Sequence, residues 1–110
     1  MAWLVRDGDV LAALDVVTLS LAGRGVVGVK DLESALLLRR PPLVLQTFTA
    51  GLAVDVAFCD REMQVRHIVC LRRHGMTLRR PGAACAVVAR AGAFERWDLA
   101  PGDQLEVKGG

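Results

Sequence analysis

The chain has 110 residues, of which 53% are apolar and 24% are charged, and its formal net charge is +2. This length fits one domain spanning residues 1–110, and the apolar content excludes an intrinsically disordered chain. The longest stretch without a charge, residues 41–54, is too short for a membrane span, which needs about 20 apolar residues. We therefore expect one globular domain without a membrane span.

Short apolar segments follow one another along the first half of the chain, at residues 3–6, 10–14, 16–23, 35–38 and 43–48. Asp7-Gly8 favours the positive φ angles of a tight hairpin turn between the first two segments. The segment 16–23 is too densely apolar to separate a helix from a strand. Pro41-Pro42 cannot donate ladder hydrogen bonds, so this pair predicts a break or a sheet edge.

The second half contains the clearest hairpin of the sequence. Residues 53–59 alternate, with Val54, Val56 and Phe58 on one face and Asp55 on the other. Residues 60–62 turn the chain, and 63–71 return it. Residues 72–82 are expected to form a loop because Gly75, Pro81 and Gly82 interrupt them. Further strands are predicted at 84–91 and 104–108, with a short helix at 92–98.

These elements predict a mainly β fold of about seven to eight short strands with one or two short helices. A single open sheet would leave one face of these apolar strands in water. We therefore expect a compact barrel or sandwich. A doubly wound α/β fold needs alternating helices of ten or more residues, which the sequence lacks.

The cysteines Cys59, Cys70 and Cys85 are odd in number, and no secretory signal precedes them. This combination predicts reduced thiols in a cytoplasmic protein. These thiols could form a metal site with His67 and His74. However, the strand period places His67 and Cys70 on opposite faces, and no CxxC pair exists. We expect neither a metal nor a cofactor.

Several motifs in order resemble the bacterial and archaeal domain-of-unknown-function family number 192. They stand at residues 24–28, 35–38 (ALLL), 46–48, 54–60, 81–83 (PGA) and 86–107. The resemblance covers residues 24–107. It implies a compact, mostly β domain with a small helical element, and it implies no established activity. The chain departs from the family pattern at Gln46, at residues 51–53 and at Ala89.

Four residues in the middle of the chain are candidate ligand-binding residues: Gln46, Thr47, Phe48 and Asp55. Asp55 could orient a ligand or transfer a proton. Alternatively, it could accept hydrogen bonds from backbone amides at a barrel rim and hold the loop 47–51. The second role is expected because no base or nucleophile stands near it in the sequence. The predicted function is a non-enzymatic binding or interaction module. The alternative is a small hydrolase or lyase with a pocket near Thr47, Phe48 and Asp55.

Positive charge is concentrated in residues 61–90, which carry seven arginines against Glu62 alone. We expect a contiguous surface formed by Arg66, Arg72, Arg73, Arg79 and Arg80. Arginine suits carboxylates and phosphates, so an acidic protein is the expected partner. Nucleic acid is not expected, because residues 61–90 contain no aromatic side chain for base stacking. The alternative is a solvated basic face from a GC-rich genome, which uses arginine wherever a charge is needed.

Overall fold

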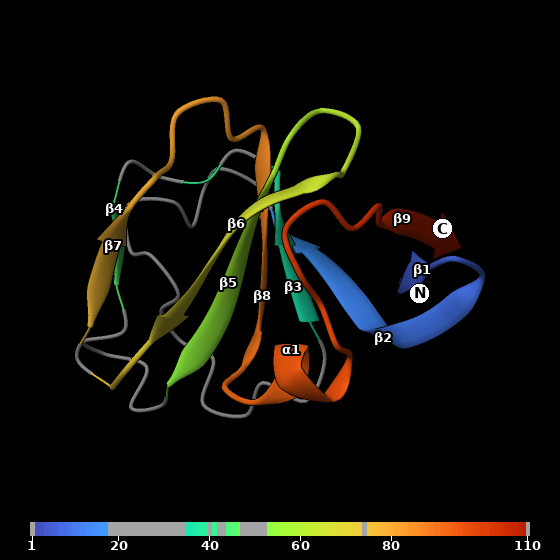
Figure 1. Ribbon diagram of the computed structural model, residues 1–110, viewed down its shortest axis with the longest axis horizontal. Coiled ribbons are helices and arrows are strands. Elements are labelled where there is room, and N and C mark those ends of the chain that lie inside the picture. The colour runs from blue at the N-terminus through green and yellow to red at the C-terminus, as the bar shows by residue number, and fades with distance from the viewer. Residues whose placement is uncertain are drawn as a thin grey trace.

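The computed structural model describes residues 2–17, 35–39, 41, 44–46, 53–73 and 75–109. Seven strands form one sheet, in the spatial order β6-β5-β8-β3-β2-β1-β9 (Figure 1). These strands are β1 (Ala2–Arg6), β2 (Asp9–Val17), β3 (Ala35–Leu38), β5 (Val54–Cys59), β6 (Val65–Leu71), β8 (Cys85–Arg90) and β9 (Glu106–Gly109). A second sheet pairs β4 (Val44–Gln46) with β7 (Met76–Leu78). The predicted mainly β fold is confirmed.

Two predicted hairpins are present. Asp7 and Gly8 both have positive φ, 52° and 85°, and they turn β1 into β2. The strands β5 and β6 pair in antiparallel register from Val54 opposite Leu71. The predicted loop 72–82 is partly wrong, because it contains β7. This strand was missed because it has only three residues and exposes two of its apolar side chains, so no alternation of buried positions marks it.

The large sheet curls until its two edges meet at one point. Val65, at the start of β6, donates its N–H to the carbonyl of Asp103 and accepts from the N–H of Gly102, at 2.8 and 2.7 Å. Leu105 donates to Met63 in the same way, at 3.0 Å. These bonds join the β6 edge to the segment that precedes β9. The result is a barrel-like sheet that is closed only at this point.

The one helix in the described residues, α1 (Ala93–Arg96), lies against the concave face of the sheet (Figure 1). Its buried side chains are Ala93 and Phe94. Arg6 on β1 donates to the carbonyls of Trp97 and Asp98 just after this helix, and it pairs with the Asp103 carboxylate at 3.1 Å. Strand β1 thereby anchors the C-terminal end of α1. No helix in the described residues is long and apolar enough to cross a membrane.

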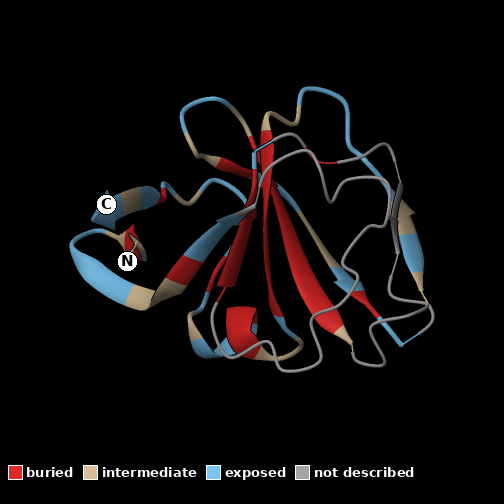
Figure 2. Ribbon diagram, turned by 180° about the vertical axis from the view of Figure 1, so that it is seen from behind, coloured by how far each residue is buried: buried red, intermediate tan, exposed pale blue. Residues whose placement is uncertain are grey.

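The central strands β3, β5 and β8 are buried on both faces, as the red strands of Figure 2 show. Their side chains therefore enter two separate apolar clusters. The inner cluster lies on the concave face and includes Leu4, Leu14, Leu37, Ala57, Cys59, Val65, Cys85, Val87, Phe94 and Leu105. The outer cluster lies on the opposite face and consists of Leu36, Leu38, Val54, Val56, Phe58, Leu71, Ala86 and Val88.

Candidate binding site at the basic end of the barrel

Asp55 faces the inner cluster, opposite Val54, Val56 and Phe58, as predicted. Its side chain is only 7% exposed. One carboxylate oxygen, Oδ2, accepts hydrogen bonds from the backbone N–H groups of Gly92 and Phe94, at 3.0 and 3.2 Å. Asp55 therefore fixes the start of α1. This is the expected kind of role, backbone amide acceptance, but the segment it holds is 92–94. The loop 47–51 lies outside the described residues.

Of the other three predicted ligand-binding residues, the structure describes only Gln46. Gln46 ends β4, where its backbone pairs with Met76. Thr47 and Phe48 lie outside the described residues. A shallow cavity of about 390 Å³ does adjoin Asp55, between the end of β6 and α1. The exposed thiol of Cys70 lines it, and desolvation, followed by the hydrogen bond and charge of Asp55, raises the pKa of this thiol.

The predicted basic residues are divided between two ends of the sheet. Arg66 lies near the start of β6, whereas Arg72 and Arg73 follow its last residue, Leu71. A strand rises about 3.3 Å per residue, so these two positions are roughly 20 Å apart. Arg90 lies at the second end as well, because it pairs with Val54, as does Leu71.

Five arginines gather at the first end, which we call the basic end: Arg39, Arg61, Arg66, Arg79 and Arg80. Arg39 and Arg61 line one cavity. A neighbouring cavity of about 410 Å³ is lined by Arg66 and by Pro81, the residue after Arg80. Arg79 donates to the carbonyl of Pro41, at 3.1 Å. Four chain segments thus contribute positive charge to one end of the barrel.

Asp60 organises the hairpin tip within the basic end. Its Oδ1 accepts from the backbone N–H groups of Glu62 and Gln64, both at 3.0 Å. Its Oδ2 pairs with Nε of Arg66 at 3.2 Å. These bonds hold the tip in one shape and place Arg61 and Met63 on the same side of it. Asp60 therefore stabilises the turn that the sequence predicts at residues 60–62.

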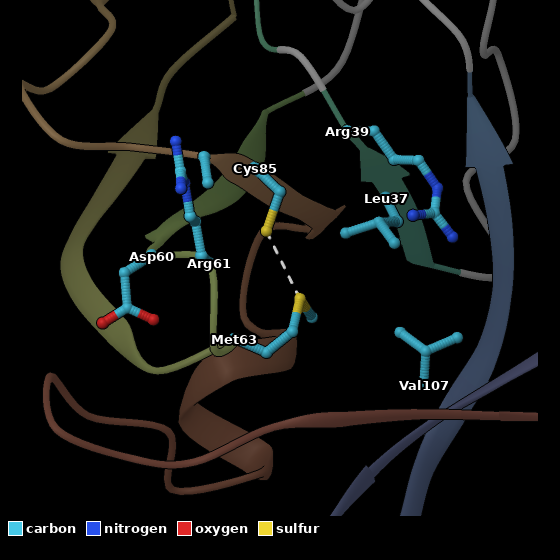
Figure 3. Close-up of a pocket in the computed structure, with 8 residues that line it drawn as sticks. Leu37, Arg39, Asp60, Arg61, Met63, Cys85 and Val107 are labelled. Atoms are coloured by element: carbon cyan, nitrogen blue, oxygen red, sulfur yellow. Dashed lines mark hydrogen bonds between the residues drawn. The ribbon is translucent and has the colours of Figure 1, made fainter.

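The cavity between Arg39 and Arg61 lies at the end of the barrel where β5 ends and β8 begins, beside the contact between Met63 and Leu105. Its volume is about 350 Å³, and it is lined by Leu37, Arg39, Asp60, Arg61, Met63, Ala84, Cys85 and Val107. Figure 3 shows Met63 and Cys85 in contact at this cavity, with the two arginines at its margin. Barrel mouths are preferred positions for ligand binding. The cavity therefore combines two sulfur-bearing side chains with two cationic side chains.

Two buried thiols lie beneath this cavity. Cys59 at the end of β5 stands directly opposite Cys85 at the start of β8. The hydrogen bond with Cys85, followed by burial, raises the pKa of Cys59. The same hydrogen bond lowers the pKa of Cys85, although burial opposes it.

Sequence reasoning missed Arg39 and Met63 as members of the site. Arg39 stands outside the basic segment 61–90, and only the pairing of β3 with β8 carries it to the basic end. Met63 has an ordinary apolar position in the sequence, but its φ of 66° is unusual for a residue with a side chain. No group of three or more His, Cys, Asp and Glu side chains in the described ranges could hold a metal.

No family model and no curated protein matches the chain. Two solved structures share its fold. One is a candidate transcription regulator from Sinorhizobium meliloti 1021, with a TM-score of 0.78 and 19% identity over 96% of this chain and 91% of that one. The other is a protein of unknown function from Novosphingobium aromaticivorans, with a TM-score of 0.74 and 14% identity over 96% of this chain and 82% of that one. At these identities the likeness shows the fold alone: the chain is similar to small bacterial β domains.

Proposed function

We propose that the protein is a non-enzymatic binding module whose basic end docks an acidic protein partner. The observation that carries this proposal is that Arg39, Arg61 and Arg66 line two adjacent cavities, with Arg79 and Arg80 in the segment that leads into the second one. We also propose that the module belongs to the domain-of-unknown-function family number 192, on the motifs within residues 24–107. The cysteine pattern supports a cytoplasmic location.

The excess of positive charge at the basic end supports an anionic partner. Among the described residues that line the two cavities, Arg39, Arg61 and Arg66 stand against one carboxylate, that of Asp60, which is already paired with Arg66. Such an excess of one sign repels itself unless water or an anion lies against it. The planar guanidinium group binds carboxylates with two parallel hydrogen bonds, which favours acidic side chains as the bound groups.

The chemistry of the surface favours a protein over a nucleic acid. Residues 61–90 supply four of the five arginines and contain no Phe, Trp or Tyr. Single-stranded nucleic acids are normally held by aromatic stacking in addition to charge. A duplex remains the competing partner, because one protein of the same fold is named as a candidate transcription regulator. The experiment below therefore includes duplex DNA as a probe.

The test compares two variants that each remove two positive charges. Arg61→Ala/Arg80→Ala changes the basic end, and Arg73→Ala/Arg90→Ala changes the opposite end; all four side chains are exposed. A fluorescent polyglutamate peptide and a fluorescent duplex are titrated with each protein over a series of salt concentrations. A surface ion pair contributes up to about 1 kcal/mol. We therefore expect the first variant to bind the peptide about tenfold more weakly, and the second to bind like the parent.

Binding of the peptide should also weaken as salt rises, because screening reduces the attraction between exposed charges. Tighter binding of the duplex than of the peptide would overturn the acidic-protein proposal in favour of a nucleic acid. Equal losses of peptide affinity in the two variants would show that the location of the removed arginines does not matter. The basic end would then be an ordinary solvated surface. Absence of binding to both probes would also overturn the proposal.

A further inference from the structure

Sulfur-bearing side chains from three chain segments lie at or behind the cavity in the basic end. Cys59 and Cys85 occupy directly opposite positions on β5 and β8, and both side chains lie in the inner cluster. The Cys85 thiol donates a hydrogen bond to the thioether of Met63, with the two sulfurs 3.3 Å apart (Figure 3). The Cys59 thiol lies behind Cys85 and donates to the carbonyl of Ala57, at 3.8 Å. Cys85 is thus the central member of a sulfur cluster that the proposed docking function does not use.

We propose that Cys59, Cys85 and Met63 form a binding site for a soft monovalent cation, namely Cu(I). Thiolate and thioether ligands select Cu(I) among the biological metals. Zinc prefers four ligands of nitrogen, oxygen or thiolate sulfur, and the described residues contain no group of His, Cys, Asp and Glu that could hold it. The proposal rests on the sulfur atoms and does not depend on an acidic partner.

Binding requires each cysteine to lose its proton, because the thiolate is the metal ligand. Two thiolates and one Cu(I) ion carry a net charge of −1. Arg39 and Arg61 line the same cavity and can balance this charge.

The site is also accessible from outside. Cys85 is 7% exposed and lines the open cavity, whereas Cys59 behind it is fully buried. Met63 is half-buried and stands on the hairpin tip that Asp60 fixes. Its backbone is left-handed, with φ of 66°, which is uncommon for a residue with a side chain. A cation entering through the cavity would meet Cys85 and Met63 first.

The experiment titrates Cu(I) into the reduced protein without oxygen, in competition with a coloured Cu(I) chelator. We expect one Cu(I) per chain and the release of one proton from each of the two thiols, measured in weak buffer. Cys85→Ser should weaken binding by about a hundredfold or more, and Met63→Leu by about tenfold, since even residues that only support a ligand change metal affinity by roughly 10–100-fold. X-ray absorption should detect sulfur as the only ligand atom.

Cys70→Ser is the matched control. Cys70 is an exposed thiol opposite Asp55 at the other end of β6, so this variant should bind Cu(I) like the parent. Retention of tight binding by Cys85→Ser, or its loss in Cys70→Ser, would overturn the proposal. Absence of one-to-one binding would overturn it as well. None of these outcomes alters peptide binding by the arginine variants, so the two proposals fail separately.

Discussion

The two faces of β5 are both buried, but they differ in chemistry. The outer cluster receives Val54, Val56 and Phe58, and every one of its buried members is a hydrocarbon side chain. The inner face receives Asp55, which accepts from the N–H groups at the start of α1, and Cys59, which lies opposite Cys85. The outer cluster can only stabilise the fold, because nothing in it donates, accepts or ionises. The inner face stabilises the fold and also supplies the candidate site, because Cys85 from the inner cluster lines the cavity at the basic end.

The largest effect is expected from a substitution in the outer cluster. Phe58 is fully buried, so Phe58→Ala leaves a cavity in the protein interior. This change should lower the free energy of unfolding by about 3–5 kcal/mol. Urea unfolding of the two proteins measures this difference. A loss of less than about 1 kcal/mol would show that the outer cluster is not a packed core and that the two faces do not differ as described.

A smaller effect is expected from the polar group on the inner face. Asp55→Ala removes the acceptor of two backbone N–H groups, those of Gly92 and Phe94. Leaving such a buried donor unpaired costs about 1–3 kcal/mol. The variant should therefore unfold at lower urea concentration, and hydrogen exchange at these two amides should accelerate more than at β6. Asp55→Asn is the control, because its side-chain oxygen can still accept.

Unchanged exchange at Gly92 and Phe94 in Asp55→Ala would contradict the assignment of Asp55 to the start of α1. It would return Asp55 to the list of candidate ligand-binding groups.

The smallest effect concerns the reactivity of Cys70. Desolvation and the neighbouring Asp55 raise the pKa of this thiol above its ordinary value of 9.0. Because the thiolate is the reactive form, alkylation of Cys70 should reach half its maximal rate above pH 9 although the side chain is exposed. Asp55→Asn should move this midpoint down, since the neutral amide no longer opposes ionisation. Mass mapping of the alkylated peptide follows Cys70 separately from the two buried cysteines.

A midpoint at or below pH 9 in the parent would mean that Cys70 does not interact with Asp55. The inner face would then be less polar at this end than the register of β5 and β6 implies.

Much of the fold could be predicted from local patterns. Asp7-Gly8 predicted the first hairpin, because few other dipeptides adopt two positive φ angles. The alternation at 54–58 predicted which side chains share a face, because the strand period is two. It did not show that both faces are buried. That depends on α1 packing against the inner face, and a single strand carries no information about what lies on either side of it.

The candidate site could be predicted only in part. The concentration of arginines in residues 61–90 indicated a basic surface, but the sequence suggested that all of them lie together. The length of β6 separates Arg72 and Arg73 from Arg66, while the return of the chain through β7 carries Arg79 and Arg80 back toward it. Arg39 joins them from a segment far away in the sequence. Which charges become neighbours is decided by strand pairing, which local composition does not encode.

The sequence by itself determined that this is a single, mainly β domain with an unequal distribution of charge, because strand period, turn residues and composition act locally. Only the tertiary structure decided that Cys59 lies opposite Cys85 and that Met63 reaches the same cavity. Pairing between β5 and β8 depends on which of several similar apolar strands lie side by side. That choice is made by the packing of the two clusters and by the meeting of the sheet edges at Val65 and Asp103.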